Sequence, residues 1–299
     1  MLKDVYSTHY NVYSKIRSNF QRRFAKKNQI PILSLFYFIT SAILGTYLGQ
    51  NFLTDNKVRH RIADKVEKMY LDLQAKTLIE IWPGKGAITK LIKTISEDFL
   101  VIEKDATMKA GLEEILQGKG KIIIDDVLNV NMFESPLPPF QKGGSNTFIV
   151  WNLPYYITSP ILRKFFWTGE TTLLGGLFMI QAEVGEKITA DAKKKSFLYR
   201  LLNYGYELHY LKTIPTKAFS PPPKVKSCLI SLVKKSETPP IPFDQLTNFL
   251  EHFAPYSRKT LGKIMKMLEK KDQSYLIPEQ LQKKRLEELN RNDLEMILK

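Results

Sequence analysis

Three acidic side chains stand at or near the ends of short apolar runs, in an order that suits the binding of a nucleoside. Glu80 lies in the first run, Glu103 ends the second, and Asp126 directly follows the third. A carboxylate at a strand end suits the hydroxyls of a ribose, and another can accept a hydrogen bond from the amino group of adenine. Each acid alone fits a helix cap or a solvated strand end, so the prediction rests on their order. Together they predict a nucleoside cofactor across the carboxyl edge of a parallel sheet.

A glycine-containing turn, Trp82 to Gly86, follows the run that carries Glu80. Gly84 and Gly86 allow the backbone to approach a ligand closely, and the helix expected after them would present its N-terminus to it. The turn lacks the full Gly-x-Gly-x-x-Gly pattern, which disfavours a phosphate-rich dinucleotide.

A fourth candidate site follows the apolar run Thr147–Trp151. Asn152 offers an amide oxygen as acceptor, Pro154 stiffens the turn, and Tyr155 offers a flat face for stacking. An acceptor beside a stacking surface suits an exocyclic amine on a planar base. An ordinary strand-to-helix turn explains this motif equally well when it is considered alone.

The elements that must position these side chains alternate between strands and helices, which predicts an α/β protein with a parallel, doubly wound sheet. Apolar runs predict strands over residues 77–81, 99–103, 121–125, 147–151, 174–181, 211–214 and 225–233. Helical periodicity predicts helices over residues 87–95, 105–116, 159–167, 183–188 and 197–206. A further helix is expected to start at a capping residue, Asp55, with an apolar face formed by Val58, Ile62, Val66 and Tyr70.

The bulk composition favours a polyanionic partner. The chain has 299 residues, a net charge of +15 and a pI of about 9.6, which suits nucleic acid or an anionic membrane surface. A soluble protein with a lysine-rich surface has the same composition. The single cysteine, Cys228, excludes an intramolecular disulfide and a cysteine-based zinc site, and the scattered histidines predict no metal site.

Composition divides the chain into three parts. Residues 1–47 form a basic arm followed by an apolar segment, and the uncharged run 30–48 has the length of a membrane helix. The polar residues within that run also suit a buried or partner-facing helix. Residues 48–236 hold the strands, and residues 237–299 are predicted to form a small helical domain with clusters of basic residues.

The chain resembles the KsgA-type (RsmA) small-subunit rRNA adenine N6,N6-dimethyltransferases over residues 48–299. The cofactor-site part of the resemblance rests on Leu48–Leu53, Glu80–Gly86, Glu103 and Asp126. The remaining motifs are Asn152–Tyr155, Gln181–Glu183, Phe219–Val225, Arg258–Leu261 and Lys284–Leu289.

The resemblance implies a Rossmann-like methyltransferase sheet with a small C-terminal all-helical domain that binds RNA. It implies S-adenosyl-L-methionine as cofactor, no metal, and small-subunit (16S-type) rRNA in a pre-ribosomal 30S-type particle as partner. It also implies a cytoplasmic monomer linked to ribosome biogenesis, with membrane contact through residues 30–48 as an additional hypothesis. The implied cofactor-binding residues are Gln50, Asn51, Leu53, Glu80, Trp82, Gly84, Gly86, Glu103, Asp126 and Asn152. The implied catalytic residues are Asn152, Leu153, Pro154, Tyr155 and Phe219.

These residues suggest direct methyl transfer to the N6 atom of adenine. The amide oxygen of Asn152 and a carbonyl of Leu153 or Pro154 would accept the N6 hydrogens, which favours a more nucleophilic nitrogen. Tyr155 on one face and Phe219 on the other would hold the flipped base.

The chain departs from the family pattern at Trp82, where the family has a glycine. If this position needs a positive φ, tryptophan is strained there or crowds the methionine end of the cofactor. Trp82 therefore keeps open a catalytically weakened assembly or transcription factor as one alternative. A large-subunit rRNA methyltransferase of the macrolide-resistance type is the other. The arm before Leu48 is also longer and more apolar than the family usually carries.

Overall fold

The structure is a computed structural model that describes residues 51–130, 146–152, 162, 173–189, 197–237, 240–270 and 275–299. Residues Gln50–Lys299 form one compact unit. The predicted arm and the apolar run 30–48 lie outside the described residues. None of the helices in the described ranges is long and apolar enough to cross a membrane.

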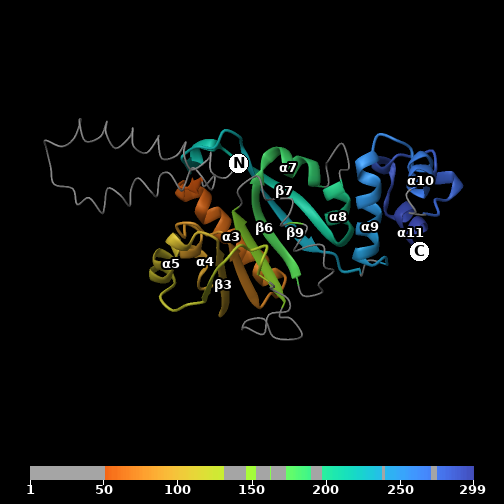
Figure 1. The fold of residues 1–299 in the computed structure, drawn as a ribbon. Helices are drawn as coiled ribbons and strands as arrows, with labels where there is room; N and C mark the ends of the chain where they lie inside the picture. Colours follow the sequence, from red (N-terminus) through yellow and green to blue (C-terminus); the bar gives the residue numbers. More distant parts are fainter. Residues whose placement is uncertain are drawn as a thin grey trace, which may run out of the picture. The chain divides into compact units, whose positions relative to one another are not determined.

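A seven-stranded sheet with the strand order β4-β3-β2-β5-β6-β9-β7 forms the centre of the compact unit (Figure 1). The strands are β2 (Thr77–Ile81), β3 (Asp98–Glu103), β4 (Lys121–Ile124), β5 (Thr147–Asn152), β6 (Leu173–Gln181), β7 (Tyr206–Ile214) and β9 (Ser227–Lys234). All neighbouring pairs from β4 through β6 are parallel, and β9 is antiparallel to both β6 and β7. The predicted α/β fold with a doubly wound sheet is confirmed, except that β9 runs against the other strands.

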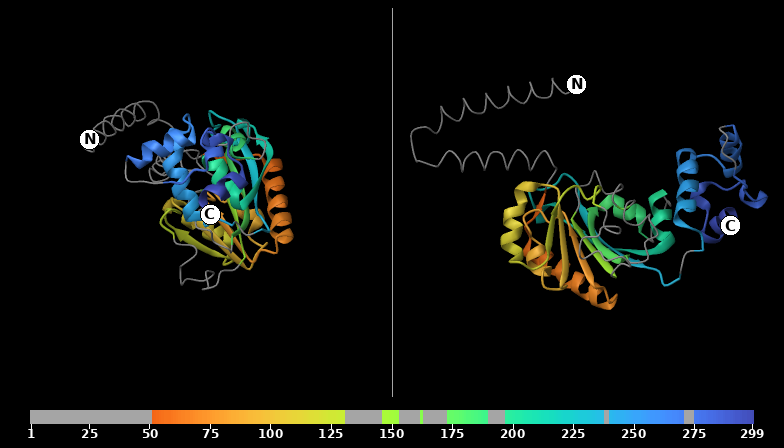
Figure 2. Two further views of the ribbon diagram at one scale, coloured as in Figure 1. Left: turned by 90° about the vertical axis from the view of Figure 1, so that its right-hand side faces the viewer. Right: turned by 60° about the horizontal axis from the view of Figure 1, so that its bottom comes forward.

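Helices cover both faces of the sheet because its strands are apolar on both faces. One face is covered by α3 (Asn56–Asp72), α4 (Thr89–Ile92) and α5 (Lys109–Leu116). The other is covered by α7 (Ala182–Ile188) and α8 (Phe197–Gly205), as Figures 1 and 2 show. Strand β2 illustrates the pattern, since Leu78 packs on the α3 side while Ile79 and Ile81 pack on the other.

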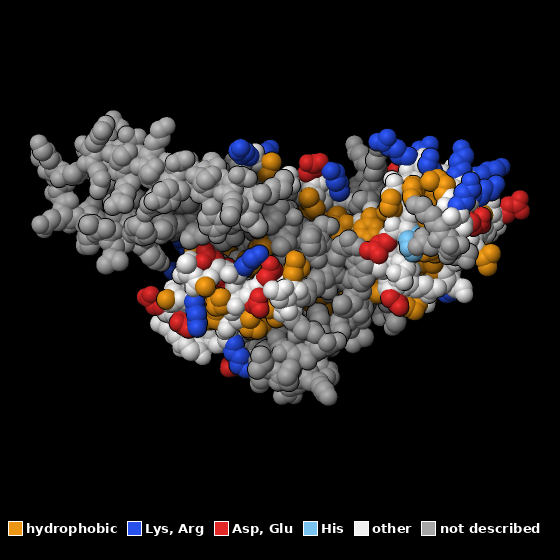
Figure 3. Space-filling view, viewed as in Figure 1, with side chains coloured by type: hydrophobic (Ala, Val, Ile, Leu, Met, Phe, Trp, Pro, Cys, Tyr) orange, Lys and Arg blue, Asp and Glu red, His pale blue; other side chains and the backbone are white. Residues whose placement is uncertain are grey.

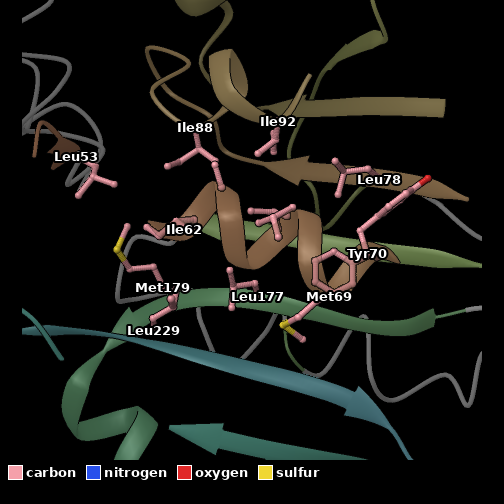
Figure 4. Close-up of a cluster of buried hydrophobic side chains, with 14 of the residues drawn as sticks. Leu53, Ile62, Met69, Tyr70, Leu78, Ile88, Ile92, Leu177, Met179 and Leu229 are labelled. Atoms are coloured by element: carbon pink, nitrogen blue, oxygen red, sulfur yellow. The ribbon is translucent and has the colours of Figure 1, made fainter. Parts of the chain in front are cut away.

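Helix α3 begins where the sequence predicts. The carboxylate of Asp55 accepts a hydrogen bond from the backbone N–H of Val58 at 3.0 Å, which caps the helix. The predicted apolar face is buried at Ile62, Val66 and Tyr70. Figure 4 shows the α3 side chains packed between the sheet and the α4 segment, with Leu78 and Leu177 among their neighbours.

The order of the strands fixes where a ligand can bind. Strand β2 is central, the chain proceeds outward through β3 and β4, and it then crosses to β5 on the other side of β2. Parallel sheets that reverse direction in this way leave a crevice at the carboxyl ends of the strands, on either side of the reversal. The crevice of this chain is therefore expected beyond the ends of β2 and β5.

Three predicted elements differ from the structure. The helix expected over residues 87–95 is only Thr89–Ile92, and the one expected over 105–116 is a 3-10 turn, Ala106–Met108, followed by α5. Strand β7 starts at Tyr206, where a helix was expected to end. Its first residues alternate between buried and exposed side chains, which is the period of a strand and not of a helix. The helix expected over residues 159–167 lies almost entirely outside the described residues.

The C-terminal part is helical, as predicted. It contains α9 (Phe243–Phe253), α10 (Leu261–Glu269) and α11 (Arg291–Leu298), joined by short 3-10 turns. The core of these helices includes Leu201 and Tyr204 from α8. Arg200, which is also on α8, donates a hydrogen bond from Nη1 to the Leu289 carbonyl at 2.5 Å. This part therefore packs on α8, and the domain boundary between residues 236 and 237 stays a prediction.

Candidate functional site

The parallel strands end at the same edge of the sheet and bring the predicted site residues together. Ile81 of β2 lies opposite Ile102 of β3 and Trp151 of β5, and Glu103 lies opposite Ile124 of β4. The side chains at or just beyond these positions belong to Trp82, Glu103, Asp126 and Asn152. Residues far apart in the sequence thus line one edge, as their order predicts.

The turn after β2 has the backbone conformation that glycine favours. Gly84 has a φ of +55° and Gly86 a φ of +69°. A Cβ at Gly84 would lie 3.1 Å from the Phe52 ring, and one at Gly86 would lie 2.4 Å from Cδ1 of Ile115. At Gly84 and Gly86 the turn therefore has room for backbone only, and the N–H of Gly86 donates to the Pro83 carbonyl at 3.0 Å.

Glu103 fastens this turn to the next strand. Its Oε2 accepts a hydrogen bond from the N–H of Gly84 at 3.0 Å, and its Oε1 accepts one from the N–H of Asp105 at 2.8 Å. Burial raises the pKa of the Glu103 carboxyl, whereas these N–H donors oppose the shift. A carboxylate oxygen can accept more than one hydrogen bond, so Glu103 keeps capacity for ribose hydroxyls.

Glu80 is a second buried acid, and it lies close enough to Glu103 for their charges to interact. It is 3% exposed, and its Oε2 has no hydrogen-bond partner among the described residues. Burial raises the pKa of Glu80 to about 8; the charge of Glu103 acts in the same direction, whereas hydrogen bonding to Thr89 opposes it. Glu80 is therefore mainly protonated near pH 7, a state that burial of a carboxyl group favours.

The carboxylate of Asp126 is held in place by the backbone of Leu128 and by a lysine. Its Oδ1 accepts a hydrogen bond from the N–H of Leu128 at 3.0 Å, and its Oδ2 lies 2.7 Å from Nζ of Lys104. Lys104 is not among the site residues predicted from the sequence. Its position directly after Glu103 is a signal that would have identified it, because the side chain must emerge at the same edge.

Trp82 has the positive φ that would strain a tryptophan at this position. Its φ is +56°, in the left-handed region where a side chain is strained. The indole is 8% exposed and belongs to the same buried cluster as Ile81, Val127 and Val130. Its Nε1 has no hydrogen-bond partner among the described residues. The strain is thus accompanied by extensive burial of the ring.

A small second sheet ties the N-terminal cofactor motif to the motif at Phe219. Strand β1 (Phe52–Leu53) pairs with β8 (Phe219–Ser220) in antiparallel register, with Leu53 opposite Phe219. Nζ of Lys85 lies 4.6 Å from the centre of the Phe52 ring, on the glycine turn. Both Leu53 and Phe219 are buried, at 1% and 4% exposed. Little of the Phe219 ring is therefore exposed, and its role against a base stays a prediction.

The remaining predicted residues divide into two groups. Asn51 and Asn152 are described and half-buried. Gln50, Leu153, Pro154 and Tyr155 lie outside the described residues, so the stacking surface and the carbonyl acceptors stay predictions. Among the described residues, the buried Oε2 of Glu80 and the close backbone approach allowed at Gly84 and Gly86 fit a nucleoside cofactor with a cationic end.

Comparisons with known proteins agree with this arrangement. The model of the family described as Ribosomal RNA adenine dimethylase matches residues 44–297. A Ribosomal RNA small subunit methyltransferase A from Aster yellows witches'-broom phytoplasma is 33% identical over 71% of this chain and 77% of its own length. The protein of the same name from Hydrogenobaculum sp. is 30% identical over 83% of this chain and 90% of its own.

Solved structures show the same fold. A dimethyladenosine transferase from Plasmodium falciparum has a TM-score of 0.63 at 21% identity, covering 83% of this chain and 96% of that one. The 23S rRNA methyltransferase ErmE has a TM-score of 0.57 at 22% identity, covering 83% of this chain and 98% of that one. The predicted methyltransferase architecture is thus confirmed.

Glu80 should make the stability of the protein depend on pH. Because its pKa is raised to about 8 in the folded protein, stability is fully present below the ordinary glutamate pKa and is lost as the pH rises through about 8. We expect Glu80→Gln to remove this loss, so that the variant gains stability relative to wild type between about pH 5 and 8. Urea unfolding across this range measures the effect. The exposed Glu97→Gln variant is the control, and parallel curves for wild type and Glu80→Gln would contradict the assignment.

Substitutions at Trp82 should distinguish the free-energy cost of the strained backbone from the stabilisation by the buried indole. Losing a buried indole costs about 3–5 kcal/mol, whereas relief of the left-handed strain returns about 1–2 kcal/mol. We therefore expect Trp82→Gly to lower the unfolding free energy by about 2 kcal/mol.

The control is Trp82→Ala, which loses the same ring but keeps the strain. It should be less stable than Trp82→Gly by about 1 kcal/mol, because alanine is disfavoured at a positive φ. Denaturant midpoints of both variants measure the difference. An alanine variant more stable than the glycine variant would show that this position is not strained.

Proposed function

Because the chain belongs to the ribosomal RNA adenine dimethylase family, we propose that it transfers methyl groups from S-adenosylmethionine to the N6 atoms of adenines in small-subunit rRNA. The product is N6,N6-dimethyladenine, and the activity serves ribosome biogenesis. The observation that supports this function most is the shared edge of the parallel strands, where Glu103 ends β3, Asn152 ends β5 on the other side of β2, and Asp126 follows β4.

Each of these strand ends suits one part of the cofactor. Glu103 would accept hydrogen bonds from the ribose hydroxyls, and Asp126 one from the adenine amine. The glycine turn from Trp82 to Gly86 would pass beside the methionine portion, with Glu80 buried behind it. Gln50, Asn51 and Leu53 would complete the site, since β1 pairs with β8 and so lies beside Phe219.

The chemistry needs positioning more than it needs strong acids or bases. When bound, S-adenosylmethionine supplies a methyl group that is already electrophilic. Asn152 lies at the end of β5, opposite Met179 of β6, so its backbone is fixed by pairing. Its amide oxygen would accept an N6 hydrogen and stabilise the positive charge that develops on the nitrogen. Leu153 or Pro154 would provide the second acceptor, and Tyr155 and Phe219 would align the base.

A basic face on the helical part supports RNA as the substrate. Backbone hydrogen bonds from Leu261 to Lys284 at 2.8 Å and from Gly262 to Gln282 at 3.0 Å join the segments that open α10 and precede α11. This joins two of the basic clusters seen in the sequence. The exposed cations of the face are Arg258, Lys259, Lys263, Lys266, Lys270, Lys283 and Arg285. Figure 3 shows Lys and Arg side chains gathered over α10, where they would contact RNA phosphates.

The relatives favour small-subunit rRNA over large-subunit rRNA as the substrate. The relatives reported above are named for the small subunit, whereas the 23S enzyme ErmE is similar at the level of fold alone. We also propose a cytoplasmic monomer, with residues 30–48 as a further contact to a membrane or a partner.

Mapping of modified adenines tests this function. We expect the purified protein with S-adenosylmethionine to produce N6,N6-dimethyladenine in unmodified small-subunit particles. Asn152→Ala should lower the rate by roughly 10²–10³-fold while cofactor binding persists, because one acceptor for the developing charge is lost. The exposed Asp64→Ala variant on α3 is the control and should match wild type. Undiminished transfer by Asn152→Ala would refute its role, and modification of large-subunit rRNA alone would refute the substrate.

A further inference from the structure

One cation occupies the position where the proposed cofactor's base should be recognised. Nζ of Lys104 lies 2.7 Å from Oδ2 of Asp126, the carboxylate that would accept the adenine amine. We infer that Lys104 competes with the purine for Asp126, and thereby sets both the affinity for the cofactor and the selectivity for an amino group on its base. This inference rests on the proposed function.

Hydrogen bonds restrain both the backbone and the carboxylate of Asp126. Its Oδ1 already accepts the N–H of Leu128 at 3.0 Å. Its own N–H is held by Oδ1 of Asp125 at 2.6 Å, and that oxygen also accepts Nδ2 of Asn129 at 3.1 Å. The backbone and one oxygen are thus fixed, so Oδ2 is the atom that both Lys104 and a base would approach.

The backbone of Lys104 is equally fixed, whereas its side chain reaches the solvent. It stands between Glu103 and Asp105, which are joined by a hydrogen bond from the Asp105 N–H to Oε1 of Glu103 at 2.8 Å. The Lys104 side chain is 41% exposed, whereas that of Asp126 is 20% exposed. An ion pair with one exposed partner is weak and readily opened. The ammonium can therefore withdraw into water when a base arrives, at a small cost to binding.

The chemistry of the two donors predicts a change in selectivity. An ammonium and an adenine amine both donate hydrogen bonds, and the charge of the ammonium weakens the acceptor that the amine needs when both approach Oδ2. A purine with an oxo group at the same position offers an acceptor, which Asp126 alone would repel but Lys104 would bind. Lys104 should therefore weaken binding of the amino purine and reduce discrimination against the oxo purine.

Binding of S-adenosylhomocysteine and S-inosylhomocysteine, measured by calorimetry on the full chain, tests the inference. An exposed ion pair contributes up to a factor of about five in affinity. We expect Lys104→Met to bind S-adenosylhomocysteine roughly two- to fivefold more tightly than wild type, and S-inosylhomocysteine no more tightly. Lys104→Arg keeps the positive charge and should bind both ligands with wild-type affinity.

Two further variants separate competition from other effects. Lys68 forms a comparable exposed ion pair with Asp72 at 3.1 Å on α3, so Lys68→Met should bind both ligands as wild type does. In an Asp126→Asn background, Lys104→Met should bring no gain, because the ion pair is already absent. A gain that persists there would reflect new packing by methionine and would overturn the inference.

The dependence of binding affinity on ionic strength gives an independent test of the inference. Salt screens the ion pair between Lys104 and Asp126, so added salt should narrow the difference in affinity between wild type and Lys104→Met. An unchanged affinity of Lys104→Met for S-adenosylhomocysteine would overturn the inference and leave the proposed function intact. If wild type bound neither S-adenosylmethionine nor S-adenosylhomocysteine, the proposed function would fail and the inference would fail with it.

Discussion

The hydrogen bonds of one buried carboxylate hold the site together. Glu103 accepts N–H groups from Gly84 in the turn after β2 and from Asp105 after β3, so one side chain fixes the connections at two neighbouring strand ends. The Phe52 ring packs against Gly84, and the pairing of β1 with β8 brings Phe219 beside Leu53. Segments from the start, middle and later part of the compact unit are thereby joined at one edge of the sheet.

This arrangement places unfavourable features at the edge where the cofactor would bind. Glu80 and Glu103 are both buried, and burial raises the pKa of each. The backbone of Trp82 is strained, and Lys104 forms an ion pair with an oxygen of Asp126. Strained or desolvated groups persist in proteins where the surrounding structure holds them, and they concentrate at functional sites. A cationic cofactor would offset the cost of ionising the two buried acids, Glu80 and Glu103.

Much of the fold and the membership of the site followed from the sequence, for physical reasons. Continuous apolar runs identify buried parallel strands, and parallel strands place their carboxyl ends together, so Glu103 and Asp126 were predicted to share an edge. The family has a glycine where this chain has Trp82, which suggested a positive φ or a close backbone approach, and the φ of Trp82 is +56°. The antiparallel direction of β9 was not predicted, because apolar periodicity carries no information about strand direction. Strand β7 was predicted too short, since the exposed residues Glu207 and His209 interrupt the apolar run at its start. The pairing of Lys104 with Asp126 depends on the register of β3 against β4, which periodicity does not reveal.

The central claim is that these strand ends form a single cofactor site, and hydrogen exchange of the amides tests it most directly. With S-adenosylmethionine present, exchange should slow at Gly84, at Lys104 and Asp105, and at Val127 and Leu128, while the amides of α9 and α11 remain unchanged. Slower exchange confined to the helical part, or no change at any of the strand ends at a saturating cofactor concentration, would contradict the claim.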